Sequence, residues 1–215
     1  MIKVYRKILR NYADNGLEIT LNKIVFSIIG FFYQNKAYRI YRKNIASSGA
    51  EKGSPSNEFD FHLLEIHEDD LIKQIEAMEE WLSGLIKRKL QAGSICVVAM
   101  DGNQVAGFNA ISFGRVFMPL VCTERTFRAQ EAWSDQITVS KKYRGKGLAT
   151  DLRLEAFKFL SERGIKKFYG GTLPANIPNR KLSRKVGFQE LGDIRYKKLL
   201  MYQKWSFERT GDEIS

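Results

Sequence analysis

A chain of 215 residues, with 44% hydrophobic and 12% aromatic residues, can bury a core of its own and does not have the composition of a disordered protein. Its two cysteines, Cys96 and Cys122, and its two histidines form no CxxC or HExxH pattern, so the sequence predicts neither a disulfide framework nor a metal site. The net charge of +11 indicates a partner that carries phosphate groups, such as a nucleotide cofactor, an anionic membrane or a nucleic acid.

The first 45 residues hold most of the excess charge. Nine Lys or Arg against two acidic residues leave +7 in this segment, out of the total of +11, and +4 in the remainder. Large apolar residues recur here at helical spacing: Leu17, Leu21, Ile24, Val25, Ile28, Ile29 and Phe32. The densest apolar stretch, residues 24–33, is shorter than the roughly 20 residues that span a membrane. The sequence therefore predicts a basic amphipathic helical extension over residues 1–45, and neither a transmembrane helix nor a signal peptide.

Three partners for this extension stay open. Its apolar face can pack on the rest of the chain or on a second copy, which would give a homodimer. It can also lie on an anionic membrane, which would make a cytoplasmic protein peripheral at the inner face of the membrane. Nucleic acid is the least favoured partner, because only residues 33–43 interleave basic residues with aromatic ones.

Residues 46–58 are small, polar and rich in turn formers, which predicts a linker. The pattern then predicts a strand, a helical stretch that breaks near Ser83 and Gly84, and two strands joined by a hairpin at Asp101-Gly102-Asn103. These elements span residues 59–66, 71–91, 94–100 and 104–113. No regular pattern is evident over residues 114–132.

The second half of the chain alternates strands with helices. The expected strands are residues 133–139, 166–172, 188–191 and 194–205, the expected helices are residues 148–163 and 176–185, and residues 206–215 form a tail. This order predicts an α/β (α+β) protein in which helices cover a mixed sheet.

One segment carries chemistry: a strand, a glycine-rich turn and a helix over residues 137–149. Unpaired N–H groups at a helix N-terminus concentrate about half a positive charge. Gly145 and Gly147 allow the backbone to approach a phosphate, and Arg144 and Lys146 add positive charge beside it. The turn therefore predicts a phosphate site, although it lacks the Gly-Lys-Ser/Thr of a P-loop and the full Gly-x-Gly-x-x-Gly pattern.

The turn resembles the pyrophosphate loop of the GNAT (GCN5-related N-acetyltransferase) family, Gln/Arg-x-x-Gly-x-Gly/Ala, at Arg144, Gly147 and Ala149. A second motif of that family, an Asn followed after about ten residues by Gly-Phe, is matched at Asn176 and at Gly187-Phe188. The resemblance covers residues 58–205. It implies a GNAT domain over residues 59–205, with a mostly antiparallel central sheet whose middle strands splay apart. More loosely, the chain is similar to bacterial members with a basic N-terminal helix.

The resemblance also implies an activity: N-acetyl transfer from acetyl-CoA to an unidentified amine, which attacks the thioester directly in a ternary complex. The pantetheine arm would bind the backbone of three strand residues, the pyrophosphate would bind the loop, and one asparagine would lie near the arm. In this chain the strand residues would be Ile137, Thr138 and Val139, and the asparagine would be Asn176. The loop residues would be Arg144, Gly145, Lys146, Gly147, Leu148, Ala149 and Thr150.

An ammonium acceptor must lose a proton, and in this family the base often lies on the strand before the loop. Strand alternation would put Trp133, Asp135, Ile137 and Val139 on one face. Asp135 is therefore the first candidate for the base and Glu131 the second, although Asp135 can also serve only as a hydrogen-bond acceptor at a strand edge. The backbone N–H of Val139 is the candidate donor to the developing oxyanion.

The proton donor for the leaving thiolate departs from the family pattern. Many members have a tyrosine after the Leu of the second motif, where this chain has Ser183. A serine hydroxyl is a poorer acid, and Tyr143 and Tyr169 do not occupy the equivalent place. This difference leaves open an alternative function, a catalytically weak GNAT-fold protein that binds acyl-CoA or tethers a partner at a membrane.

Overall fold

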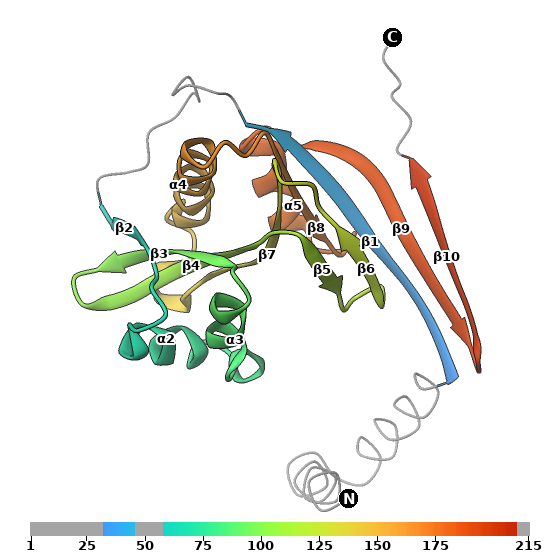
Figure 1. Ribbon diagram of the computed structural model, residues 1–215, viewed down its shortest axis with the longest axis horizontal. Helices are drawn as coiled ribbons and strands as arrows, with labels where there is room; N and C mark the ends of the chain where they lie inside the picture. The colour runs from blue at the N-terminus through green and yellow to red at the C-terminus, as the bar shows by residue number, and fades with distance from the viewer. Residues whose placement is uncertain (1–31, 46–57, 210–215) are drawn as a thin grey trace, which may run out of the picture.

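The computed structural model describes residues 32–45 and 58–209 (Figure 1). The strands of its main sheet are β1 (Tyr33–Asn44), β2 (Asp60–Leu63), β3 (Ile95–Asp101), β4 (Gln104–Ser112), β7 (Glu131–Val139), β8 (Lys167–Thr172), β9 (Gln189–Leu199) and β10 (Tyr202–Arg209). They lie in the order β10-β9-β1-β8-β7-β4-β3-β2. A separate hairpin pairs β5 (Arg115–Met118) with β6 (Thr123–Thr126).

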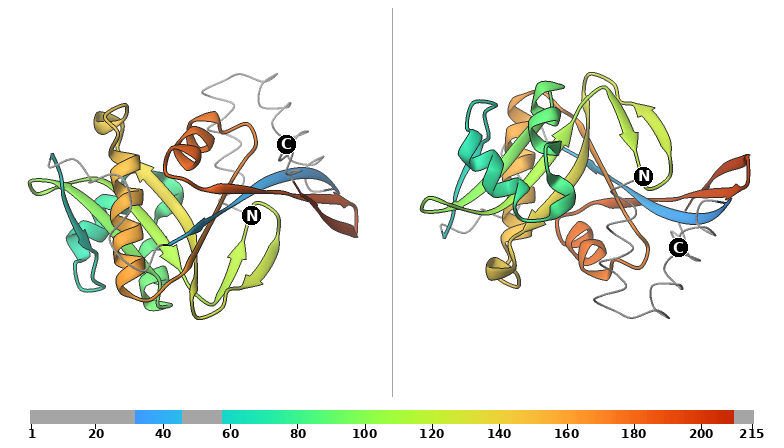
Figure 2. Two further views of the ribbon diagram at one scale, coloured as in Figure 1. Left: turned by 90° about the horizontal axis from the view of Figure 1, so that it is seen from above. Right: turned by 90° about the horizontal axis from the view of Figure 1, so that it is seen from below.

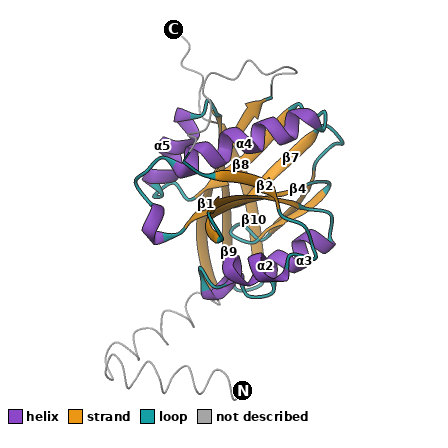
Figure 3. Cartoon of the chain, turned by 90° about the vertical axis from the view of Figure 1, so that its left-hand side faces the viewer, coloured by secondary structure: helices purple, strands orange, loops and turns teal. Residues whose placement is uncertain are grey.

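Helices cover both faces of this sheet. They are α2 (Asp69–Glu76), α3 (Leu85–Gln91), α4 (Leu148–Glu162) and α5 (Ile177–Lys185), with short 3₁₀ turns η1 (Glu80–Leu82) and η2 (Lys141–Tyr143). Side chains of β3 alternate between the layers: Val97 and Ala99 pack with α4, whereas Val98 and Met100 pack with α2 and α3. Figure 3 shows α4 and α5 on one side of the sheet and α2 and α3 on the other.

The middle of the sheet opens. β7 and β8 run parallel, while the other strand pairs of the main sheet run antiparallel. Their pairing covers three residue pairs and stops at Trp133 and Tyr169, although both strands continue. The predicted class, a mostly antiparallel sheet with two splayed strands and flanking helices, is confirmed.

Strand β1 corrects the prediction for the N-terminal extension. Residues 33–44 were expected in a helix apart from the sheet, but they pair antiparallel with β8 on one side and β9 on the other. Their alternation has period two, with Tyr38 and Ile40 buried on one face and Arg39 between them, paired with Asp193 at 2.8 and 3.0 Å. The rest of that extension, residues 1–31, and most of the expected linker lie outside the described residues.

Two further predictions are wrong. Residues 114–132 contain the β5–β6 hairpin, in which Val116 and Met118 are buried and Phe117 is exposed; each strand is only four residues long, too short for its pattern to be evident in the sequence. The expected break near residues 192–193 is absent, because Gly192, at φ +145°, continues β9 through an irregularity in its pairing with β1. The break instead follows Leu199, and β10 takes up part of the expected tail.

Strands β1, β9 and β10 extend beyond the helical layers as a three-stranded arm (Figures 1 and 2). Near the body of the protein the arm is part of the core, where Tyr38, Ile40 and Tyr196 pack with Trp133 and the β5–β6 hairpin. All eight residues of β10 are exposed at the edge of the sheet.

Candidate active site

A cleft forms where β7 and β8 separate. Beyond Trp133, the N–H and C=O groups of β7 that point away from β4 have no partner strand, so they face this opening. A cavity of about 610 Å³ lies here. Its lining includes Gln136, Ile137, Thr138, Val139, Arg144, Ala149, Asn176 and Leu182. Six of the predicted cofactor residues are therefore brought together around one cleft.

The glycine-rich turn lies at one end of the cleft. Gly145 and Gly147 have φ of +83° and +88°, and a Cβ at either would meet no atom within 4 Å. These positive values explain why the turn contains glycine. Across residues 145–149, no backbone N–H donates to another group of the described chain. The turn thus presents several free donors at the N-terminus of α4, which is the arrangement that an anion needs.

Arg144 joins this turn to the cleft. Its Nε donates to the carbonyl of Val139 at 3.0 Å, and its Nη2 lies 3.8 Å from Glu79 across the cleft. Lys146 is 3.6 Å from Glu58. Both ion pairs are exposed, so each is weak, and a phosphate at the turn can replace the carboxylate.

Asp135 occupies a β-bulge in β7. Ala110 pairs with Gln136 and Ile111 with Ser134, which leaves Asp135 as the extra residue. The prediction that Trp133, Asp135, Ile137 and Val139 share a face is therefore wrong in part: Trp133 and Asp135 line one cavity, whereas Ile137 and Val139 pack on the α4 side. The bulge turns Asp135 and Gln136 together toward the opposite side.

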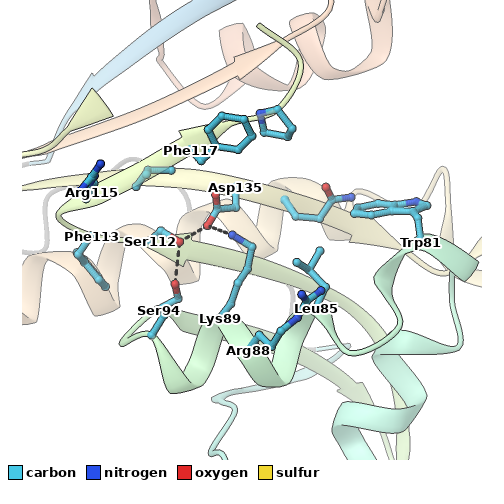
Figure 4. Close-up of a pocket in the computed structure, with 14 residues that line it drawn as sticks. Trp81, Leu85, Arg88, Lys89, Ser94, Ser112, Phe113, Arg115, Phe117 and Asp135 are labelled. Carbon is cyan, nitrogen blue, oxygen red and sulfur yellow. Dashed lines mark hydrogen bonds and ion pairs between the residues drawn. The ribbon is translucent and has the colours of Figure 1, made fainter. Parts of the chain in front are cut away.

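There Asp135 forms a polar cluster (Figure 4). Its Oδ2 lies 2.9 Å from Nζ of Lys89 in α3 and accepts a hydrogen bond from the hydroxyl of Ser112, which in turn lies 2.7 Å from that of Ser94. The Asp135 side chain is only 10% exposed. It lines two cavities of about 450 and 310 Å³, both of which also touch Gln136 and Trp81. Because these two residues also line the cleft, the three spaces meet beside Asp135.

Tyr38 is a site residue that the sequence did not reveal. Its ring lies 6.3 Å from that of Trp133 and lines the 310 Å³ cavity with Asp135 and Gln136. The ring packs so closely on Gly171 that a Cβ there would lie 2.3 Å from it. Burial raises the pKa of Tyr38 above its usual value, and the nearby charge of Asp135 adds to the effect, so the phenol stays protonated. No hydrogen bond to its hydroxyl comes from residues 32–45 or 58–209.

A buried arginine lies behind this centre. Arg153 of α4 donates to Ser134 at 2.5 Å and to Asn109 at 3.4 Å, and its guanidinium lies over the rings of Phe168 and Phe188. Burial lowers the pKa of Arg153 to about 10, which still leaves it charged at neutral pH. Ser134 is the first residue of β7 beyond its pairing with β8.

Two other predicted catalytic residues do not reach the centre. Glu131 begins β7, where it accepts hydrogen bonds from the N–H of Arg128 and the hydroxyl of Tyr169. Burial alone would raise the pKa of Glu131, but these hydrogen bonds, together with the positive charges of Arg125 and Lys167, hold the pKa below its usual value. Ser183 is buried in α5 and lines none of the three spaces, although Asn179 and Leu182 of the same helix line the cleft.

Asn176 holds the start of α5 against the cleft. Its Oδ1 accepts from the N–H of Asn179 at 3.2 Å, which is an N-cap, and Pro178 follows at the second position of the helix. The asparagine of the second sequence motif thus caps α5, in addition to any contact that it makes with a ligand.

Comparisons with known proteins agree with this geometry. Residues 60–188 match the sequence model of the Acetyltransferase (GNAT) family. No curated protein matches the chain.

Similar folds occur among solved structures. They include a Drosophila protein (TM-score 0.56, 10% identity, 84% of this chain and 57% of that one), a GCN5-related N-acetyltransferase from Sphaerobacter thermophilus (0.53, 13%, 91% and 58%) and a GNAT-family protein from Novosphingobium aromaticivorans (0.52, 15%, 83% and 66%). At such identities the likeness shows the fold alone, and this chain matches less than two thirds of each of these proteins.

Proposed function

Because the chain belongs to the GNAT family of acetyltransferases, we propose that it transfers an acetyl group from acetyl-CoA to a primary amine that binds beside Asp135. One observation carries the proposal: the cleft between β7 and β8 runs from the glycine-rich turn to the bulge that bears Asp135. Acetyl-CoA supplies the acetyl group as a reactive thioester.

The residues present fit this cosubstrate. The free N–H groups over residues 145–149 suit a pyrophosphate, and Arg144 and Lys146 supply charge beside it. The unpaired edge of β7 at Ile137, Thr138 and Val139 offers donors and acceptors to an amide-bearing chain. The acetyl end would then lie near the bulge.

The acceptor side is the pair of cavities beside Asp135. Trp81, Phe117 and Trp133 give it apolar walls, and the carboxylate of Asp135 can hold an ammonium group and then accept its proton. Lys89 occupies that carboxylate now, and an acceptor ammonium would compete with it. This placement supports amine attack in a ternary complex, because the acceptor cavities and the cleft share Gln136 and Trp81.

An acceptor screen tests the proposal. The protein is incubated with acetyl-CoA and a panel of primary amines, and acetylated products are identified by mass spectrometry. We expect transfer to at least one amine that carries an apolar or aromatic body, given the lining of the cavities. Binding of acetyl-CoA without transfer to any amine would favour the second candidate below.

Ser183 should matter little. We expect Ser183→Ala to keep turnover of the best acceptor within a few-fold of wild type, because this side chain is buried and lines none of the cavities. A loss of about a thousandfold, with acetyl-CoA binding intact, would instead make Ser183 the proton donor.

Tyr38 is the better candidate for a donor at the reacting atoms. Tyr38 lines the cavity beside Asp135 and its phenol stays protonated, so it can donate to a leaving thiolate or an oxyanion there. We expect Tyr38→Phe to lower kcat by about tenfold or more, with the Kd for acetyl-CoA unchanged. Tyr41→Phe is the matched control, because Tyr41 lies on the same strand but packs in the core on the other face. Equal kcat values for both variants would remove Tyr38 from the mechanism.

A second candidate function is acyl-CoA binding with little turnover. Two observations favour it: Ser183 does not line the cleft, and the Asp135 carboxylate is already paired with Lys89. Three further proposals accompany this candidate. The protein would tether a partner at a membrane, form a homodimer through residues 1–45 and lie peripherally at the cytoplasmic face of a membrane. The helices that the structure describes include none long and apolar enough to cross a membrane.

A further inference from the structure

The arm of β1, β9 and β10 ends in an apolar turn. Leu199 pairs with Tyr202, so Leu200 and Met201 form a two-residue turn at the tip. Met201 is 94% exposed and Leu200 is 58% exposed. The neighbouring side chains at this end are also large and exposed: Phe32, Tyr33, Leu199 and Tyr202. An apolar cluster of this kind is a candidate interaction surface rather than a scattered residue.

The turn has unfavourable residues for a free hairpin. Two-residue turns favour Gly, Asn or Asp, because at least one position has positive φ and both face water. Leu200 has φ of +54°, a region that bulky residues rarely adopt. Backbone strain at Leu200 therefore occurs in the same turn as the exposed apolar surface of Leu200 and Met201. A partner that covers the tip would remove the cost of exposing this apolar surface to water.

Charge is arranged around this tip in a second pattern. The outermost row across the three strands is Tyr33, Leu199 and Tyr202, and the next row on the same face includes Lys197 and Lys204. These two lysines lie directly opposite each other, which is destabilising for like charges. Residues 32–37 and 196–205 contain four lysines and no acidic residue. An anionic partner would offset this repulsion.

We propose that the tip of the β9–β10 hairpin docks on an anionic lipid surface. Leu200 and Met201 would enter the boundary between headgroups and acyl chains, and Tyr33 and Tyr202 would lie at the headgroup level that tyrosine favours. Lys197 and Lys204, one row farther back, would meet the negative headgroups. This surface does not depend on acetyl transfer.

The course of the chain supports a membrane as the occupant. The N–H of Leu200 donates to the carbonyl of Phe32 at 2.6 Å, so the segment before Phe32 joins the arm at this tip. The sequence of that segment is rich in large apolar residues over positions 24–31. A second copy of the chain is less suitable, because a symmetric contact between two tips would bring four lysines together.

Vesicle sedimentation of the full-length protein tests the proposal. Because a deletion of residues 1–45 would remove β1 from the sheet, point variants are used. Wild type should bind vesicles of phosphatidylglycerol and phosphatidylcholine, and not phosphatidylcholine alone. Leu200→Gly/Met201→Ser should weaken binding about tenfold or more. Its melting temperature should stay equal or rise, because Gly suits the positive φ of residue 200.

Charge variants distinguish the effect of the lysines at the tip from the effect of the protein's net charge. Lys197→Gln/Lys204→Gln should also weaken binding roughly tenfold. Lys73→Gln/Lys158→Gln removes the same charge from exposed positions on α2 and α4 and should bind as wild type does. Undiminished binding by the tip variant, or equal losses in both lysine pairs, would overturn the proposal. A wild-type dimer that the tip variant converts to a monomer, with no vesicle binding, would also overturn it and assign the tip to a second copy.

Discussion

Arg144→Ala/Gly147→Trp should abolish saturable binding of acetyl-CoA in calorimetry, with a loss of affinity of at least about a hundredfold. Gly147 has φ of +88°, and the space around a Cβ there is empty, so a tryptophan would fill the place that a pyrophosphate needs. Arg144→Ala removes a cation that the structure holds against the cleft through the carbonyl of Val139. Both changes act on the anion site and leave the core intact.

The other end of the same helix supplies the control. Gly164 follows α4, has φ of +71° and also has no atom within 4 Å of a Cβ. Gly164→Trp therefore imposes the same backbone strain and the same bulk far from the cleft. We expect it to bind acetyl-CoA as wild type does. Comparable losses in both variants would mean that strain on α4, and not occupation of the anion site, explains the result.

The second large effect is expected at Asp135. Asp135→Asn should lower kcat for the best amine acceptor by about a hundredfold or more, because an amide cannot accept the proton of an ammonium. Binding of acetyl-CoA should not change, since Asp135 lines the acceptor cavities and not the cleft. The loss should appear in kcat rather than only in KM, which separates proton transfer from acceptor binding.

Glu131→Gln decides between the two carboxylates that the sequence proposed. Glu131 lies on the same strand, but it is held at the far end of β7 by Arg128 and Tyr169. We expect turnover within a few-fold of wild type. If Glu131→Gln were the slower variant and Asp135→Asn retained its rate, the assignment of the base would be reversed. Near-normal rates in both would indicate that solvent accepts the proton.

The arrangement of Asp135 shows how a bulge changes a site. With regular alternation, Asp135 would share a face with Ile137 and Val139, which pack on α4. The extra residue lets β7 present hydrophobic side chains to α4 and then direct Asp135 and Gln136 to the other side. The carboxylate thereby reaches a cavity, while the backbone beside it lines the cleft. In the proposed reaction, this one irregular residue would place the carboxylate between the acceptor and the thioester.

The local features of this protein could be predicted from its sequence. The glycine-rich turn, the capped start of α5, the break at Gly84 and the hairpin after Asp101 all depend on residues close together in the chain, where backbone preference and capping act directly. For the same reason the order of most strands and helices in residues 59–205 was predictable, and the two motifs were enough to predict the family.

Features that depend on pairing between distant strands could not be predicted from the sequence. The pairing of distant strands places β1 between β8 and β9, which brings Tyr38 to the 310 Å³ cavity beside Asp135, and it sets the bulge at Asp135. It also aligned Tyr33, Leu199 and Tyr202 at the tip of the arm. Residues 33–44 fit a helix or a strand comparably by pattern alone, and the hydrogen bonds of two neighbouring strands, together with burial against Trp133, select the strand.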